Sequence, residues 1–435
     1  MASIKPSLEF KRDLVEFGAN TFNQCFQCAT CSTVCPLSPE KDPFPRKEML
    51  WLQWGLKDRL IRDPDIWLCH YCGQCSQHCP RGANPGETMM ALRRCAITRY
   101  DWTGISRRLY RSVWWEVGAV VAVGLLVVAL FALSGAFTPA RMVTTRVAMG
   151  TFIPVHWVHI SDWVLASLLT FFLLTNSLHM ARLMLDGSKP PWSVYVRQLK
   201  VLLAQALVQA KWRNCEKPNR WRKHFILVTG YVTMFVLVMF FLPWLQVNGP
   251  RFTLLSWLGY YAAFAILYYS GDAMISRWRK REEMHRFSHA SDWMFLILLF
   301  LTALTGILVN AFRLLDLALP AYLTYVIHLA IAVPMLVVEV PFMKWAHLAY
   351  RPLAIYLKAV KEQTRELEGA GRLRALPMAT GISAGIGAPA VYSPRSARWR
   401  SSSVAPATFG GLAGGGPSGG APSRRFQDES HTNQR

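Results

Sequence analysis

Two stretches of the chain, CFQCATCSTVCP at residues 25–36 and CHYCGQCSQHCP at residues 69–80, decide the fold of its N-terminal part. Both have the spacing C-x2-C-x2-C-x3-C followed by proline, and together they hold eight of the ten cysteines. We call them the first and the second cysteine run. The chain starts with MASIKPSLEFKRDLVEF, which lacks the apolar stretch of a secretory signal, so we expect the runs in the reducing cytoplasm. There, clustered thiols are ligands more often than disulfides.

The spacing within each run predicts a [4Fe–4S] cluster. One tight loop supplies three thiolates, and the fourth cysteine, just before proline, ligates the other cluster in two-cluster ferredoxins. The first cluster is therefore expected on Cys25, Cys28, Cys31 and Cys79, and the second on Cys35, Cys69, Cys72 and Cys75. A pair of zinc sites is the alternative, but four ordered cysteines before proline, occurring twice, argue against it.

The composition of the rest of the chain is that of a membrane protein. Of 435 residues, 52% are hydrophobic and 17 are tryptophan, which is typical of chains with interfacial aromatic belts. The net charge of +22 is concentrated in a few loops, and no basic helix with base-reading spacing is present, so no nucleic-acid partner is expected.

The predicted fold class is all-α, with a helical two-cluster ferredoxin domain followed by a six-helix transmembrane bundle of the cytochrome b type. Helices are expected at residues 46–61, where apolar residues recur at helical spacing, and at residues 84–99, where Asn84 and Pro85 form an N-terminal cap. The domain boundaries are placed at 1–113 for the iron–sulfur domain and 114–360 for the haem b domain. Residues 361–435, rich in Gly, Ser, Pro and Arg, are expected to form a disordered tail.

Six apolar segments are each long enough to cross a bilayer. They lie near residues 114–135, 157–181, 225–246, 252–273, 291–311 and 322–346. The loop at 182–223 carries ten Lys and Arg, whereas the loops expected on the other side carry one or two, which places both termini in the cytoplasm. The predicted location is the bacterial inner membrane. Within that loop the amphipathic run at 192–212 could lie on the membrane surface, against the iron–sulfur domain, or in solvent.

Histidines recur at the ends of these segments, which favours bis-histidine ligation of haem b. From their expected depths we pair His159 with His328 on the periplasmic side and His224 with His347 on the cytoplasmic side. The reserves are His156, His179 and His289. A single haem, with the other histidines interfacial, is the alternative. His328 and His347 are 19 residues apart, about 100° around an ideal helix, so a common face needs a distortion that Pro334 and Pro341 could provide.

Glu339 is the acidic residue deepest in a predicted span, and buried acids in membranes are candidates for proton or quinone chemistry. An ion pair with Lys344, five residues further on, is the structural alternative.

Residues 25–80 resemble the iron–sulfur subunit of heterodisulfide reductase. The segment HLAIAVPMLVVEVPFMKWAHLAYRPL at 328–353 is similar to the last helix of the haem b subunit of respiratory nitrate reductase, and the segments at 224–235 and 291–306 are similar to two others. That resemblance implies haem ligation by His224, His328 and His347. The chain departs from it at Met234, where the family has a second histidine, and in a spacing of 19 rather than 18 on the last helix.

The fusion of both parts resembles the membrane subunit of the quinone-interacting membrane-bound oxidoreductase (Qmo) complexes. This implies electron exchange between quinone and soluble flavin- and iron–sulfur-containing partner subunits, possible coupling to adenylylsulfate reductase, and a lipid bilayer as surroundings. Substrate chemistry is expected on partner chains, because no strand-GxGxxG-helix pattern is present. The alternatives are a heterodisulfide-reductase-type conduit and a non-catalytic membrane redox sensor or anchor.

Overall fold

The computed structural model describes residues 5–213 and 218–375. These residues form helices joined by loops, with no strand among them, which confirms the all-α class for the described part of the chain. The segment at 376–435, most of the predicted tail, lies outside the described residues.

The N-terminal part consists of short helices around the cysteine runs. They are α1 (Leu8–Glu16), α2 (Thr30–Thr33), α3 (Arg46–Gln53), α4 (Lys57–Arg62), α5 (Gln74–Gln77), α6 (Pro85–Tyr100) and α7 (Ile105–Arg111), with 3-10 turns η1 (Phe22–Gln24) and η2 (Pro64–Trp67). The predicted cap of α6 is present, since the side chain of Asn84 accepts a hydrogen bond from the amide of Glu87 at 3.3 Å.

The helix predicted at 46–61 is wrong in one respect, because the chain turns at Gly55 and divides it into α3 and α4. Gly55 has φ of +66°, and a Cβ there would lie 2.9 Å from the carbonyl oxygen of Ser7. Only glycine fits this conformation so close to another backbone segment.

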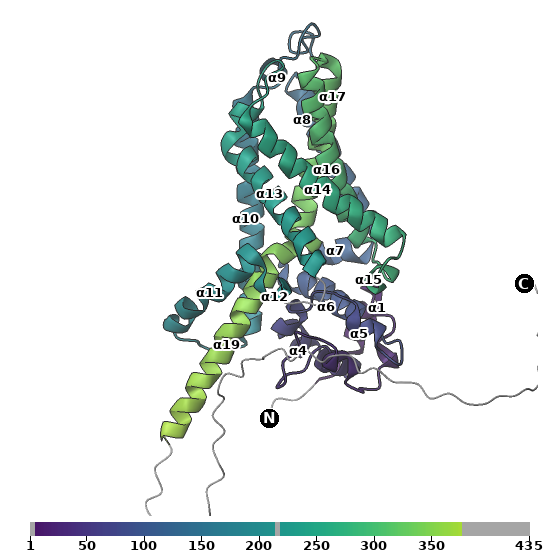
Figure 1. The fold of residues 1–435 in the computed structure, drawn as a ribbon, viewed down its shortest axis with the longest axis vertical. Coiled ribbons are helices and arrows are strands. Elements are labelled where there is room, and N and C mark those ends of the chain that lie inside the picture. Colours follow the sequence, from purple (N-terminus) through teal and green to yellow (C-terminus); the bar gives the residue numbers. More distant parts are fainter. Residues whose placement is uncertain (1–4, 214–217, 376–435) are drawn as a thin grey trace, which may run out of the picture. The chain divides into compact units, whose positions relative to one another are not determined.

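The apolar segments form a bundle of long helices. They are α8 (Val113–Leu133), α10 (Val155–Leu185), α13 (Pro218–Leu245), α14 (Leu254–Trp278), α16 (Ser291–Leu314) and α17 (Ala318–Pro334), with the short α9 (Met149–Phe152) and α15 (Glu283–Arg286) in connecting loops. Helix α13 packs along α14, α14 along α16, and α16 along α17, as Figure 1 shows.

Five helices in the described residues are long and apolar enough to cross a membrane, rather than the six predicted. The helix at the fourth predicted segment, α14, does form and packs between α13 and α16, but it is not among the five. Its four tyrosines and Asp272 lower its hydropathy. Six crossings, and the side on which the termini lie, therefore stay predictions.

The last predicted span, 322–346, is not one uninterrupted helix. Helix α17 ends at Pro334 and is followed by a π-helical turn, η3 (Met335–Glu339), then by α18 (Val340–Phe342), the 3-10 turn η4 (Lys344–Ala346) and α19 (His347–Ala375). Pro334 and Pro341 lack amide protons, so regular helical hydrogen bonding is interrupted twice within eight residues. Helix α19 also continues beyond residue 360, so the boundary predicted for the tail is too early.

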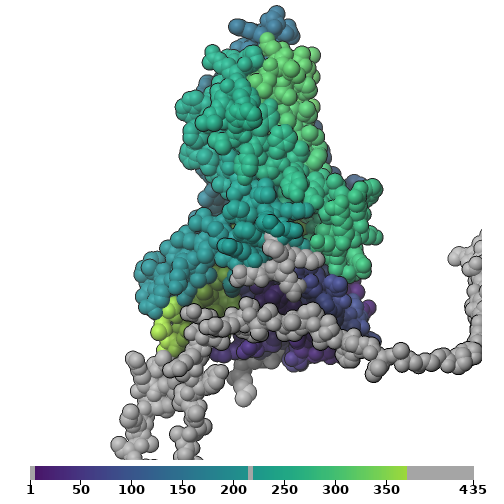
Figure 2. Space-filling model, viewed as in Figure 1, coloured from purple at the N-terminus to yellow at the C-terminus, as the bar shows by residue number. Residues whose placement is uncertain are grey.

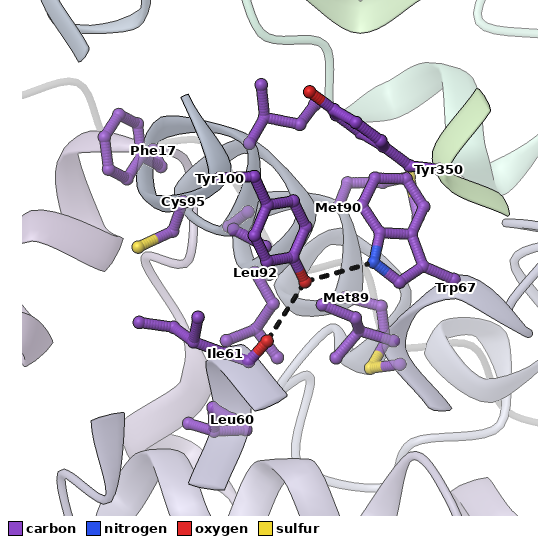
Figure 3. Packing of buried hydrophobic residues seen from close by; sticks show 14 of the residues in the cluster. Phe17, Leu60, Ile61, Trp67, Met89, Met90, Leu92, Cys95, Tyr100 and Tyr350 are labelled. Atoms are coloured by element: carbon purple, nitrogen blue, oxygen red, sulfur yellow. Dashed lines mark hydrogen bonds between the residues drawn. The ribbon is translucent and has the colours of Figure 1, made fainter. Parts of the chain in front are cut away.

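One hydrophobic core joins the N-terminal helices to α10 and α19. Trp67 and Tyr100 from the N-terminal part pack against Tyr350 of α19, with ring centroids 5.7 and 5.5 Å from the tyrosine ring (Figure 3). The hydroxyl of Tyr100 accepts a hydrogen bond from Trp67 Nε1 at 3.4 Å and donates to the carbonyl of Ile61 at 3.0 Å. The iron–sulfur part is therefore not tethered by a linker but shares its core with the helical bundle.

The amphipathic run predicted at 192–212 forms α11 (Trp192–Val208), which lies along α19 (Figures 1 and 2). The hydroxyl of Tyr356 donates to the carbonyl of Tyr195 at 3.0 Å, which fixes one side of α11 on α19. Exposed apolar side chains recur along α11 at helical spacing, namely Trp192, Val196, Leu199, Leu203 and Leu207. This pattern is typical of a helix at a membrane interface.

The buried carboxylate of Asp292 contacts basic side chains from three other parts of the molecule. Asp292, at the start of α16, accepts a hydrogen bond from Lys344 Nζ at 2.5 Å. It also lies 3.6 Å from the guanidinium of Arg94 on α6 and 3.9 Å from that of Arg277 on α14. Asp292 and Arg94 are both buried.

We predict that Asp292→Asn lowers the free energy of unfolding by about 3 kcal/mol, because it leaves buried cations without their carboxylate. Unfolding of the detergent-solubilised protein, followed by tryptophan fluorescence, measures the effect. Asp58→Asn on the exposed surface of α4 is the matched control and is expected to change stability by less than about 0.5 kcal/mol. Equal stability of the two variants would contradict the role given to Asp292.

Candidate iron–sulfur and haem site

The two cysteine runs, 44 positions apart, follow the same unusual backbone path. Gln27 and Tyr71 occupy equivalent positions and have φ of 65° and 52°. Ala29 and Gly73, two residues further on in each run, have φ of 70° and 84°. Left-handed conformations are uncommon for residues other than glycine, so both loops are held open by their surroundings. In each run the third cysteine then lies on a single helical turn, α2 or α5.

We call the predicted ligands of the first cluster the first group and those of the second cluster the second group. Cysteines of the two runs lie near one another, because Cys79 of the second run acts on Cys25 of the first, and Cys69 and Cys72 act on Cys35. Cys31 of the first run also acts on Cys75 of the second. A pocket is lined by four cysteines together, Cys35, Cys69, Cys72 and Cys75. Crossed ligation needs this arrangement, although the ligand assignment itself stays a prediction.

Hydrogen bonds are directed at several of the sulfurs. The amide of Tyr71 donates to Cys69 Sγ at 3.3 Å, and the amide of Ala83 donates to Cys79 Sγ at 3.3 Å. The side-chain amide of Gln27 lies 3.6 Å from Cys25 Sγ. Donors of this kind favour the thiolate form, which is the form that binds iron. The residues therefore fit the clusters that their spacing predicts.

The thiols differ in how well water reaches them. Burial raises the pKa of Cys31 to about 11 and that of Cys35 to about 12. Cys28 is exposed, and its hydrogen bond with the hydroxyl of Thr30 lowers its pKa. The first group thus reaches the surface at Cys28, whereas Cys75 in the second group is buried. Binding iron must displace protons from these thiols.

Arginines gather around the second run. Arg93 of α6 and Arg351 of α19 both donate to the carbonyl of Cys69. Arg220 of α13 donates to the carbonyl of Cys72 at 3.2 Å. On the first run, the charge of Arg46 acts on Cys25 and Cys28. Three arginine side chains are thus directed at backbone carbonyls of the second run.

Aromatic rings connect the second run to the predicted cytoplasmic haem ligands. The ring of His70 stacks on Trp212 of α12 (Ala210–Arg213) with centroids 5.3 Å apart and an interplanar angle of 11°. Trp212 in turn lies 4.6 Å from the ring of His224. His347 interacts electrostatically with His224, and its Nδ1 is 2.7 Å from the carbonyl oxygen of Lys344. The structure thus brings both predicted cytoplasmic ligands close to the second pocket.

The predicted periplasmic pair has different neighbours. Nε2 of His159 lies 2.8 Å from the carbonyl oxygen of Met239 on α13, whereas Nδ1 of His328 lies 2.9 Å from Oγ1 of Thr305 on α16. Among the hydrogen bonds and ring contacts of the described residues, none joins His159 to His328, and their pairing stays a prediction.

The reserve histidines have local partners. His179 Nδ1 is 3.0 Å from the carbonyl oxygen of Tyr100, His289 Nδ1 is 2.9 Å from Oγ of Ser291, and the ring of His156 lies against that of Trp157.

Glu339 is fully buried in the π-helical turn, and neither of its carboxylate oxygens has a well-aligned hydrogen bond in the described residues. Glu116, near the start of α8, is its strongest electrostatic neighbour and is buried as well. Lys344 pairs with Asp292, so the ion pair considered for Glu339 is not the one that forms. Glu116 is the third residue of the first predicted apolar segment, and no pattern in the sequence marks it as a partner of Glu339.

Three further residues at the site were not among the predicted ligands, namely His70, Trp212 and Arg351. Alignment of the two runs would have drawn attention to His70, because Phe26 stands at the equivalent position. Trp212 and Arg351 lie far from the runs in sequence, and no motif marks them.

Comparisons with known proteins agree with this site. The family model of the 4Fe-4S dicluster domain matches residues 21–83. The chain is 35% identical over 107 residues to a protein of Archaeoglobus profundus that is like the C subunit of heterodisulfide reductase, covering 24% of this chain and 56% of that protein. It is 36% identical over 74 residues to the C subunit of the H(2):CoB-CoM heterodisulfide,ferredoxin reductase of Methanothermobacter marburgensis, covering 17% and 40%.

It is also 30% identical over 91 residues to the C subunit of the ferredoxin:CoB-CoM heterodisulfide reductase of Methanosarcina mazei, covering 20% and 52%. The chain spans about half the length of these curated relatives. No solved structure matches it. The chain therefore carries a 4Fe-4S dicluster domain similar to the C subunit of heterodisulfide reductase, and the resemblance of its helical bundle to the nitrate reductase haem b subunit stays a prediction.

Pairs of cysteine substitutions distinguish crossed from uncrossed ligation. If Cys79 serves the first cluster, Cys28→Ala with Cys79→Ala removes one cluster and leaves about four of about eight iron per chain. Cys28→Ala with Cys35→Ala then removes both. Anaerobic iron analysis with EPR of the reduced protein measures the outcome, and Cys95→Ala is the control that keeps all the iron. Uncrossed ligation gives the opposite result for the two pairs.

Proposed function

We propose that this chain is the membrane subunit of an oxidoreductase complex and that it passes electrons between soluble partner subunits and the quinone pool. The observation that carries the proposal is the direct packing of the dicluster domain on apolar helices, with Trp212 in contact with both His70 and His224. A soluble ferredoxin needs no such junction. Five helices long enough to span a membrane supply the lipid-embedded part. The bacterial inner membrane, with cytoplasmic termini, is the proposed location.

The chain's own residues would hold two kinds of redox group. The eight cysteines would hold two [4Fe–4S] clusters, which supply one-electron transfer. His224 and His347 would hold one haem b near the second pocket, and His159 and His328 are the proposed ligands of a second. Nδ1 of His347 lies against a backbone carbonyl, which orients the ring and leaves Nε2 for iron.

The first run is the proposed docking face for a soluble partner, because Cys28 and Phe26 are exposed there. Partners that contain flavin and iron–sulfur centres fit this role, since they can deliver or accept single electrons. Coupling to adenylylsulfate reductase is proposed on the Qmo resemblance alone.

Buried carboxyl groups support the quinone end of the proposal. Quinone reduction consumes protons as well as electrons, and a carboxyl group shielded from water can hold a proton. Glu339, with Glu116 beside it, is the proposed site where this proton is held.

A heterodisulfide-reductase-type conduit is the second candidate, and the similarity to the C subunit of that enzyme favours it. In that case the partner subunits, not this chain, would act on a disulfide. A redox sensor is less well supported, because sensing needs no apolar bundle packed on the clusters. Optical and EPR spectra of anaerobically purified protein provide the general test. Protein with iron–sulfur signals but without haem would contradict the membrane half of the proposal.

We expect His224→Ala and His347→Ala each to lower haem content by about one haem per chain, because b-type haem depends on both axial ligands. The pyridine haemochrome assay and the low-spin optical spectrum measure the loss. His156→Ala, whose ring lies against its neighbour Trp157, is the control and keeps full haem content. Full haem content in both test variants would show that the assigned pair is wrong.

A further inference from the structure

The residue that follows the first cysteine differs between the two runs in chemistry and in burial. The residue after the first cysteine is Phe26 in the first run and His70 in the second. Phe26 is 57% exposed, whereas His70 is 9% exposed and lines the pocket formed by the four cysteines of the second group. The second run therefore buries the polar ring of His70 at the position where the first run exposes the apolar ring of Phe26.

The neighbours of His70 fix its protonation state and tautomer. Arg351 Nη1 is 3.2 Å from His70 Nδ1, and because a guanidinium can only donate, Nδ1 must be the acceptor. A nitrogen that accepts a hydrogen bond carries no proton, so the ring proton of His70 is on Nε2.

This N–H group has no partner in the described residues. Nε2 of His70 is buried without a hydrogen bond, although an unsatisfied buried donor costs about 1–3 kcal/mol. Stacking on Trp212 and the hydrogen bond from Arg351 prevent the ring from turning away. Because His70 lines the pocket, its unpaired N–H is available to a group that the four cysteines hold.

We propose that Nε2–H of His70 donates a hydrogen bond to a sulfur of the second iron–sulfur cluster and raises its reduction potential above that of the first. The inference rests on the proposed function, in which Cys35, Cys69, Cys72 and Cys75 hold that cluster. A hydrogen bond to a cluster sulfur stabilises the negative charge that reduction adds. The first run has Phe26 in this place, and its apolar ring cannot donate a hydrogen bond.

The charges around the second pocket act in the same direction. Arg93 and Arg351 contact the carbonyl of Cys69, and Arg220 contacts that of Cys72. Three arginines thus lie along the second run, and one of them, Arg220, is in an ion pair with Glu282. Burial opposes them, because taking charge out of water disfavours the reduced state. The arginines and the His70 N–H offset this cost. The added electron is thus favoured at the second pocket, next to Trp212 and the membrane helices.

An EPR-monitored redox titration of the full-length protein tests the proposal. His70→Phe, which copies the first run, is expected to lower the midpoint potential of the second cluster and leave that of the first unchanged. A tenfold change in the ratio of reduced to oxidised cluster corresponds to 59 mV for a one-electron couple. His70→Gln, whose amide can donate, is expected to shift the potential less. Phe26→His is the matched control, and its exposed ring is expected to shift neither potential.

The outcomes separate this inference from the proposed function. Two clusters with unshifted potentials in His70→Phe would overturn the inference and leave the proposed function intact. Wild-type protein without cluster signals would overturn both. If His70→Phe does not retain the second cluster, His70→Gln and His70→Met are compared instead. A lower potential for Met than for Gln supports the hydrogen bond, and equal potentials refute it.

Discussion

The site depends on the hydrogen bonds that the guanidinium of Arg351 donates. From α19 it donates to the carbonyl of Trp67 at 3.1 Å, to the carbonyl of Cys69 and to Nδ1 of His70. The planar guanidinium can meet three acceptors at once only if all are held in place, so the loop of the second run takes its position from α19. His347 lies one helical turn earlier on the same helix. The second pocket and a proposed haem ligand are thus positioned by one rigid element.

What the sequence predicts best is local. The spacing of the cysteines specifies loops and ligand number, and Asn84 with Pro85 marks the start of α6, because a cap involves only neighbouring residues. Apolar segments long enough to span a bilayer are equally visible, since their signal is a sum over about 20 residues. Helix α14 shows the limit of that signal. Its tyrosines lower its mean hydropathy, although the helix forms.

What the sequence did not reveal depends on contacts between distant segments. Gly55 ends a helix because Ser7 lies against it, and Glu116 matters because it meets Glu339, more than 200 positions away. Similarly, His70 acquires a fixed tautomer only from Arg351. No periodicity or motif in the sequence indicates such contacts between distant segments. The pairing of His159 with His328 stays a prediction from their depth along two helices, and the structure adds only the neighbour of each ring, Met239 and Thr305.

The π-helical turn at Met335–Glu339 has a consequence for chain register. Its hydrogen bonds join residues five apart instead of four, so the turn encloses one residue more than an α-helical turn does. It lies between His328 on α17 and His347 at the start of α19. A residue can be inserted in such a turn without unwinding the helical turns on either side of it. The helical phase is lost only further on, because Met343 is extended and η4 follows it before α19 begins.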